Sequence, residues 1–335
     1  NMSVGEPDFM TPGFIKEAGK KAIDDNYSKY SPVPGYPVLR EAIARKLKRE
    51  NGLDYAASEI IVGTGGKQGV CNAILALVNP GDEVVIPAPY WVSYPQMVKL
   101  AGGMPVIVPA GIGQDFKITA AQLEAAVTPK TKLVILCSPS NPTGSVYSEE
   151  ELGELAKVVL AHDDLFVLSD EIYEHINYIG GHSSIAACPG MRERTVVCNG
   201  VSKAYAMTGW RLGWVAAPEW IVKGLGKLQG QYTSGTSSVS QMAAVAAYEG
   251  DQSCVETFRE TFRRRRDLIV SLAKDIPGLE VNVPQGAFYL FPDCSAFFGK
   301  TDGRRTIGSS TDLALYLLEE GHVATVGGEI GRAHV

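Results

Sequence analysis

Short apolar runs alternate with amphipathic stretches along most of the chain. Runs rich in valine, isoleucine and leucine predict buried strands, and apolar positions three and four residues apart predict helices. The predicted strands are 59–62, 83–86, 105–108, 133–137, 165–169, 195–198 and 213–216. The clearest predicted helices are 38–50, 68–77 and 148–160, the last with Ser148 and Glu151 at capping-box spacing. This alternation predicts an α/β fold of three layers, with a mainly parallel sheet covered on both faces.

The pattern changes near residue 251. A long, charged helical stretch at 252–274 precedes two apolar runs, 278–283 and 286–291. These runs predict strands of a smaller α+β domain that follows the large one.

Polar or glycine-rich residues directly follow four of the predicted strands. In chain order these are Gly65-Gly66-Lys67, Tyr90-Trp91, Asn141 to Gly144, and Asp170 to Tyr173. Open α/β sheets bind ligands at the carboxyl ends of their strands, so these segments predict one common site.

Lys203 stands among small and apolar residues, and Arg211 follows eight positions later. Burial disfavours the charged ammonium and lowers the pKa of a lysine, as an amine that forms a Schiff base requires. A nearby arginine suits an anionic phosphate. Taken alone, the segment favours a solvated surface lysine, and only the segments described above shift the balance.

Seven segments together resemble the fold-type I, pyridoxal-phosphate-dependent aminotransferases of class I. The resemblance is strongest to the prokaryotic-type aspartate and aspartate/prephenate aminotransferases. The segments occur in the family's order at 4–8, 30–35, 65–67, 90–91, 141–144, 170–173 and 202–211. The resemblance implies pyridoxal phosphate as cofactor, an L-amino acid and a 2-oxo acid as substrates, and a homodimer with shared active sites.

The resemblance also implies the domain organisation. A large cofactor-binding domain would span residues 13–250, and a small domain would combine 1–12 with 251–328. The substrate cleft would lie between the two domains and close on binding.

Three residues receive catalytic roles from the resemblance. Lys203 would bind the cofactor aldehyde and then carry a proton between the substrate Cα and the cofactor. Asp170 would pair with the pyridinium nitrogen and keep the ring an electron sink. Tyr173 and Asn141 would donate hydrogen bonds to the phenolic oxygen, and Trp91 would stack on the ring.

The cofactor phosphate would be held at a helix N-terminus. The resemblance places the backbone of Gly65 and Gly66 there, where N–H groups and the helix dipole favour an anion. Ser202 and Arg211 would complete the phosphate site, and Tyr30 would reach it from the neighbouring subunit.

Substrate recognition is expected at four residues. Gly5 would lie near the α-carboxylate, Trp91 and Asn141 would line the site, and Lys67 would bind the distal carboxylate of an acidic substrate. A first-turn helix lysine that reaches solvent is an equally weighted alternative for Lys67.

The sequence departs from the family near its end. The family binds the substrate α-carboxylate through an arginine in a C-terminal Arg-(Ile/Leu)-Ser-Tyr-like motif, and no such motif occurs here. Residues 322–328 match the family, whereas 329–335 do not. We therefore expect 329–335 to be a non-native tail on a chain truncated at both ends.

Composition agrees with a cytoplasmic enzyme. A net charge of −6 argues against a nucleic-acid partner, and no apolar run approaches the ~18 residues of a membrane span. The 6 cysteines lack CxxC spacing, which favours a reducing compartment. Cys137 and Cys198 are predicted in buried strands, and the histidines show no metal-ligand spacing.

Other enzyme classes fit less well. A P-loop NTPase is poorly supported because the segment 63–69 lacks the P-loop glycine spacing. A dinucleotide-binding dehydrogenase is poorly supported because no acidic residue is suitably placed after this segment to bind a ribose. A carbon–sulfur β-lyase that uses the same cofactor stays open, as does a cofactor-binding fragment without turnover. The leading hypothesis is transamination from aspartate to 2-oxoglutarate, with prephenate or aromatic specificity also open.

Overall fold

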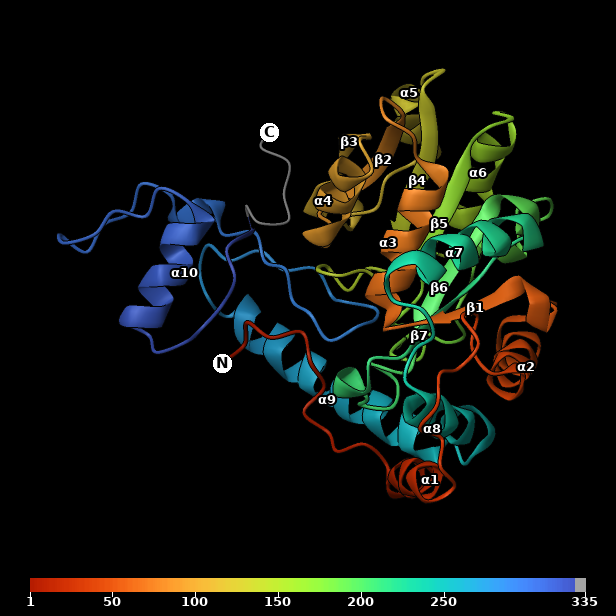
Figure 1. The fold of residues 1–335 in the computed structure, drawn as a ribbon. Coiled ribbons are helices and arrows are strands. Elements are labelled where there is room, and N and C mark those ends of the chain that lie inside the picture. The colour runs from red at the N-terminus through yellow and green to blue at the C-terminus, as the bar shows by residue number, and fades with distance from the viewer. Residues whose placement is uncertain (329–335) are drawn as a thin grey trace.

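A seven-stranded sheet forms the centre of the protein (Figure 1). The computed structural model describes residues 1–328. The strands are β1 (Ile60–Gly63), β2 (Glu83–Ala88), β3 (Met104–Pro109), β4 (Thr131–Cys137), β5 (Phe166–Asp170), β6 (Thr195–Gly200) and β7 (Gly213–Ala216). Each predicted strand from 59 to 216 matches one of them to within two residues.

The sheet is mainly parallel, as predicted. Its strand order is β1-β7-β6-β5-β4-β2-β3. Only β7 runs antiparallel to its neighbours, β1 and β6, among the strands of the described chain. The carboxyl ends of β2, β4, β5 and β6 therefore meet at one edge.

Helices cover both faces of the sheet and give the predicted three layers. One face packs against α3 (Gly66–Leu77), α4 (Ser93–Leu100) and α7 (Glu219–Tyr232). The other packs against α2 (Pro37–Lys46), α5 (Ala120–Ala126), α6 (Glu149–Leu160) and α8 (Ser238–Glu249). Alternation along β2 illustrates the two cores, because Ile86 joins the first and Val85 the second.

The remaining helices lie beside this sandwich. Helix α1 (Gly13–Asp24) packs against α8. Helix α9 (Ser253–Lys274) runs from the neighbourhood of α8 toward α10 (Ser310–Glu319), which lies on the side of the molecule away from α6 (Figure 1). Residues 1–12 run along α9, where Phe9 stacks on Phe258 and Asp8 pairs with Arg265. The domain division at residues 12/13 and 250/251 stays a prediction.

Helix boundaries agree with the sequence except in two places. The capping box at α6 is confirmed, because the Ser148 hydroxyl accepts the Glu151 N–H at 3.1 Å and the Glu151 carboxylate accepts the Ser148 N–H at 2.8 Å. Helix α3 begins two residues early, at Gly66. The predicted helix 38–50 changes at Lys46 into a π-helical turn, Leu47–Asn51, which Gly52 ends at a φ of +67°.

The two strands predicted at 278–283 and 286–291 are wrong. Neither segment forms a strand: Glu280 makes an isolated bridge to Asp293, which lies beyond the second segment, and Gly286 makes one to Asn177. Backbone groups of the second segment are used elsewhere: the Gly286 N–H donates to Gly144 at 2.8 Å, and the Ala287 N–H to Ile176 at 2.7 Å. The second run therefore docks onto loops of the sheet domain, and a lone two-stranded hairpin would be only marginally stable.

Three smaller expectations can be compared with the structure. Cys198 is buried, but Cys137 is only half-buried because it ends β4 at the cleft. Within residues 1–328, no helix is both long and apolar enough to span a membrane. The suspected tail, 329–335, lies outside the described residues.

Candidate active site

A cleft of about 1720 Å³ opens at the carboxyl ends of β2, β4 and β5. Its opposite wall comes from α9 and the segment 284–295. The predicted site residues that line it are Gly5, Gly66, Lys67, Trp91, Asn141, Asp170, Tyr173, Ser202, Lys203 and Arg211. Gly65 lies just behind this lining, next to Arg211.

Asp170 is the last residue of β5, and only 7% of its surface is exposed to solvent. Its Oδ2 accepts the hydroxyl of Tyr94 at 2.7 Å, and its Oδ1 accepts the N–H of Ile172 at 3.3 Å. Burial raises the pKa of the Asp170 carboxyl to about 6 despite these donors. A carboxylate so placed suits a cationic ring nitrogen, which would favour its ionised form.

Lys203 follows β6 in a loop packed against the N-terminal strip. Its ammonium donates to the carbonyl of Gly5. Burial lowers the pKa of Lys203, although the carboxylates of Glu6 and Asp170 act in the opposite direction. The amine is thus closer to its neutral, nucleophilic form than an ordinary lysine.

Tyr173 and Asn141 converge on one point. The hydroxyl of Tyr173 lies 2.6 Å from the hydroxyl of Tyr289, and the amide of Asn141 donates to that same Tyr289 oxygen at 3.4 Å. Burial raises the pKa of Tyr173, so its hydroxyl stays protonated and can donate. The two groups predicted to share a phenolic oxygen therefore face the same place.

An anion site is built from the start of α3. Gly65 has a φ of +82°, and a Cβ there would lie 2.5 Å from Nη2 of Arg211. Arg211 also has a positive φ of 53°, and its Nη1 donates to the carbonyl of Thr208 at 2.9 Å. Ser202 is buried beside Lys203. A free helix N-terminus with an adjacent guanidinium fits a phosphate group.

Lys67 and Trp91 lie together in the cleft. The ammonium of Lys67 is 4.8 Å from the centre of the Trp91 ring. That ring meets Tyr94 edge to face, with centres 5.4 Å apart. Lys67 is exposed but lines the cleft, so both alternatives for its role stay open.

Tyr30 is the one predicted residue that stands apart. It is 97% exposed and does not line the cleft of its own chain. Such a position does not conflict with the expectation that it serves a neighbouring subunit.

Three residues of the site escaped the sequence argument. Tyr94 follows Trp91 by three positions at the start of α4, the spacing of one helical turn, which is the signal that could have found it. Glu6 lies within the matched segment 4–8, and its carboxylate accepts the Thr208 hydroxyl. Tyr289 belongs to a run assigned to a strand, and no local signal marks it.

Known proteins place the chain in a family. The sequence pattern of the family described as aminotransferase class I and II matches residues 1–333. The chain is 50% identical over 334 residues to the bifunctional aspartate aminotransferase and glutamate/aspartate-prephenate aminotransferase of Petunia hybrida, covering 98% of this chain and 70% of that protein. It is 50% identical over 330 residues to the aspartate/prephenate aminotransferase of Cereibacter sphaeroides, covering 98% and 82%.

A solved structure gives the same result. The crystal structure of the aspartate aminotransferase from Rhizobium meliloti superposes with a TM-score of 0.96 at 45% identity, covering 100% of this chain and 84% of that one. These relatives carry aminotransferase names, which does not favour the β-lyase alternative. The chain belongs to the class I and II aminotransferases, a family that uses pyridoxal phosphate, and it is an enzyme of transamination.

Proposed function

We propose that this chain uses pyridoxal phosphate to transfer the amino group of L-aspartate to 2-oxoglutarate. The observation that carries the cofactor assignment is that one cleft contains two groups whose pKa values are shifted in opposite directions. Lys203 has a pKa lowered by burial, and the Asp170 carboxyl has a pKa raised to about 6, also by burial. Opposite shifts of this kind are typical of acid–base sites.

Each part of the cofactor has a candidate partner in this chain. Gly65, Gly66, Ser202 and Arg211 would hold the phosphate through backbone N–H groups, a hydroxyl and a guanidinium. Asp170 would hold the ring nitrogen. When bound, the protonated ring supplies an electron sink for the substrate Cα.

The residues of the chain supply the proton transfer and the orientation. Lys203 would take the proton from the substrate Cα and deliver it on the same face, since its half-buried amine lines the cleft and has a lowered pKa. Tyr173 and Asn141 would donate hydrogen bonds to the phenolic oxygen, and Trp91 would cover one face of the ring. Gly5, whose carbonyl accepts the Lys203 ammonium, lies where a substrate α-carboxylate would approach the amine.

Support for acidic substrates comes from Lys67 and from the relatives. Lys67 is an exposed cation in the wall of the cleft, where it could bind a distal carboxylate. Relatives from Petunia hybrida and Cereibacter sphaeroides are named for both aspartate and prephenate. Prephenate is therefore the second candidate acceptor.

Reconstitution tests the cofactor and the reaction together. Purified chain titrated with pyridoxal phosphate should show the visible absorbance of lysine-bound cofactor, and borohydride reduction followed by peptide mass spectrometry should find the cofactor on Lys203. L-Aspartate should then release oxaloacetate. Lys203→Ala should abolish both the attachment and the turnover, while Lys223→Ala, on the solvent face of α7, should change neither. Full turnover by Lys203→Ala would refute the assignment.

Lys67→Ala tests substrate recognition separately. Loss of a charged contact to the distal carboxylate should raise the KM for aspartate roughly 10- to 100-fold, while kcat changes little. The KM for a monocarboxylic donor such as L-alanine serves as the control and should stay constant. An unchanged aspartate KM would remove Lys67 from substrate recognition.

A further inference from the structure

The turn that follows β5 has two faces. Asp170 and Tyr173 line the cleft, whereas Glu171 and Glu174 do not line it and are 1% and 6% exposed. The backbone of the turn is bonded at several points: the Glu171 N–H donates to Cys198 and the Glu174 N–H to Glu171, both at 2.9 Å, and the Ile176 N–H donates to Tyr173 at 2.8 Å. These bonds leave the carboxylates of Glu171 and Glu174 to be held by side chains behind the turn.

Glu174 pairs with a buried lysine that lies 128 positions earlier in the sequence. Lys46, the last residue of α2, has no exposed surface, and its ammonium donates to Glu174 Oε1. Asn199 donates to the same oxygen at 2.8 Å, and Asn51 to Glu174 Oε2 at 2.7 Å. Asn51 also accepts from Lys46 at 2.7 Å, which closes the network.

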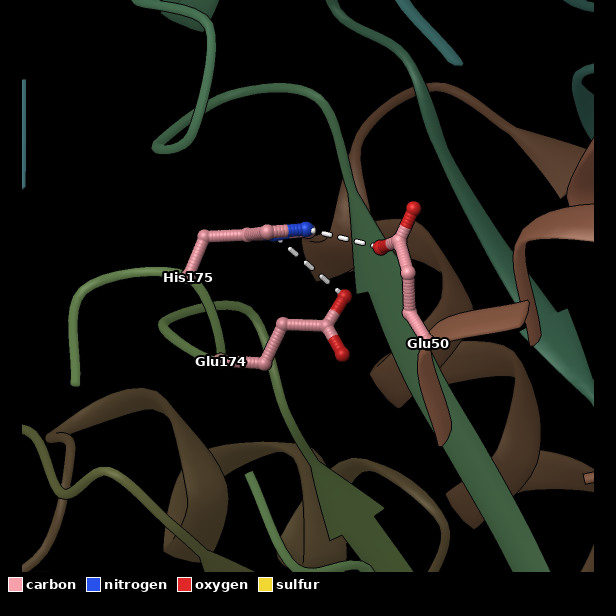
Figure 2. A group of neighbouring side chains, drawn as sticks. All are labelled: Glu50, Glu174 and His175. Carbon is pink, nitrogen blue, oxygen red and sulfur yellow. Dashed lines mark hydrogen bonds and ion pairs between the residues drawn. The ribbon is translucent and has the colours of Figure 1, made fainter. Parts of the chain in front are cut away.

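The π-helical turn after α2 adds a second set of contacts. Figure 2 shows the ring of His175 between the carboxylates of Glu50 and Glu174. Its Nε2 lies 3.0 Å from Glu50, and its Nδ1 lies 3.5 Å from Glu174. Glu50 lies four positions after Lys46, and the π-helical turn, which pairs residues five apart, also brings Asn51 beside Lys46.

Glu171 is fixed by a separate group of donors. Its Oε1 accepts the hydroxyls of Ser169, at 2.8 Å, and Ser184, and its Oε2 lies 2.9 Å from His182 Nε2. Carboxylates and imidazoles this close could hold a metal ion. Here the ammonium of Lys46 already supplies the positive charge beside Glu174 and lies 3.5 Å from Glu50.

We infer that Lys46 and Glu174 are positioning residues for the aminotransferase site. Their buried pair, with Asn51 and Asn199, holds the turn so that the Asp170 carboxylate and the Tyr173 hydroxyl keep a fixed separation and direction. The inference rests on the proposed function, because these two groups are the ones assigned to the ring nitrogen and the phenolic oxygen.

The buried pair contributes more to the direction of the side chains in the turn than to the stability of the fold. A buried ion pair can often be replaced by apolar side chains of similar volume without loss of stability, whereas removal of one partner leaves an uncompensated charge. The network does supply three directional contacts to Glu174, from Lys46, Asn51 and Asn199, in addition to the backbone bonds of the turn. A 1 Å displacement of a group that binds the reacting ring is enough to cost affinity and rate.

Two double variants separate positioning from folding. Lys46→Met/Glu174→Leu removes both charges and the hydrogen bonds to Asn51 and Asn199, while Lys46→Met/Glu174→Gln keeps an acceptor for those amides. The Gln variant should melt near the wild-type temperature, and the Leu variant should melt lower because it leaves the amides of Asn51 and Asn199 without their acceptor. We expect the Leu variant to bind pyridoxal phosphate at least ten-fold more weakly and to lose kcat with little change in the aspartate KM. The Gln variant should recover most of both losses.

A matched control removes a different ion pair. Glu59 and Arg192 join at 2.7 Å near the amino ends of β1 and β6, and neither residue lines the cleft. Glu59→Leu/Arg192→Met should leave the cofactor dissociation constant unchanged.

Hydrogen exchange gives a readout that does not depend on the cofactor. Amides 171–176 should exchange at least ten-fold faster in the Leu double variant than in wild type, and at wild-type rates in the control. Unchanged exchange together with an unchanged dissociation constant would overturn the inference. Failure of the wild-type chain to bind pyridoxal phosphate would instead refute the proposed function, and the exchange rates alone would then decide the positioning role.

Discussion

At the scale of single residues, the burial of the Asp170 carboxyl works against the stability of the fold near neutral pH. Its pKa rises from 3.8 to about 6 because burial disfavours the carboxylate. A raised carboxyl pKa means that the folded protein binds a proton more tightly than the unfolded chain does. The stability that this supplies is fully present below pH 3.8 and is lost as the pH rises through about 6.

The consequence can be measured on the cofactor-free protein. Asp170→Asn removes the titration. The difference in unfolding free energy, variant minus wild type, should therefore increase by on the order of 3 kcal/mol between about pH 4 and about pH 7.5. Urea unfolding at several pH values measures the difference. With pyridoxal phosphate present the order should reverse at pH 7.5, because only the wild type can pair with the ring nitrogen. A difference that does not vary with pH would show that Asp170 has an ordinary pKa.

At the scale of elements, the start of α3 depends on a residue without a side chain. Gly65 combines a φ of +82° with a ψ of 161°, a region of backbone space that is essentially limited to glycine. A Cβ would also displace Arg211, whose Nη2 would lie 2.5 Å away. Backbone strain and the loss of the guanidinium position therefore act together at the predicted phosphate site.

Gly65→Ala should cost about 1–3 kcal/mol of unfolding free energy. It should also weaken the binding of pyridoxal phosphate more than that of pyridoxal, which lacks the phosphate. Gly153→Ala is the matched control, because Gly153 lies within α6 with no atom near the added methyl. That change should stabilise the chain by about 0.5–1 kcal/mol and leave both affinities unchanged. Equal losses for the two ligands at Gly65 would argue against a phosphate contact.

Local sequence patterns predicted the strands of the central sheet. They failed for the run 286–291, whose backbone hydrogen bonds go to loops distant in sequence. Apart from β3 at the sheet edge, the strands from 59 to 216 are mostly buried runs, so their apolar composition identifies them without knowledge of their neighbours. The run 286–291 has similar composition, but its backbone bonds go to Gly144 and Ile176, more than 100 residues earlier. No local pattern records that competition.

At the scale of the whole molecule, the sequence could predict those site residues that lie at or just after the end of a sheet strand. Asp170 ends β5, and Lys203 follows β6, so their meeting follows from the parallel order of the sheet. Residues that join the site across the fold were not predictable in this way. Tyr289 reaches Tyr173 from the segment beyond α9, and Lys46 reaches Glu174 over 128 positions. Only the packed structure brings these pairs together.

Tyr30 extends the argument beyond one chain. It is 97% exposed and does not line its own cleft, yet it corresponds by resemblance to a tyrosine that reaches a neighbour's phosphate. If the chain forms a homodimer with shared sites, Tyr30→Ala and Lys203→Ala damage different halves of each composite site.

Mixing these two inactive variants should therefore restore activity. In a mixed dimer, one site combines an intact Lys203 with the intact Tyr30 of the other chain, and random exchange makes about a quarter of all sites intact. The measurement is aspartate turnover at limiting pyridoxal phosphate after the variants are unfolded and refolded together, with sedimentation velocity to establish the dimer. Refolding each variant alone is the control and should restore nothing. If the mixture stays as inactive as its components while mixed dimers form, Tyr30 acts within its own chain or has no part in the site.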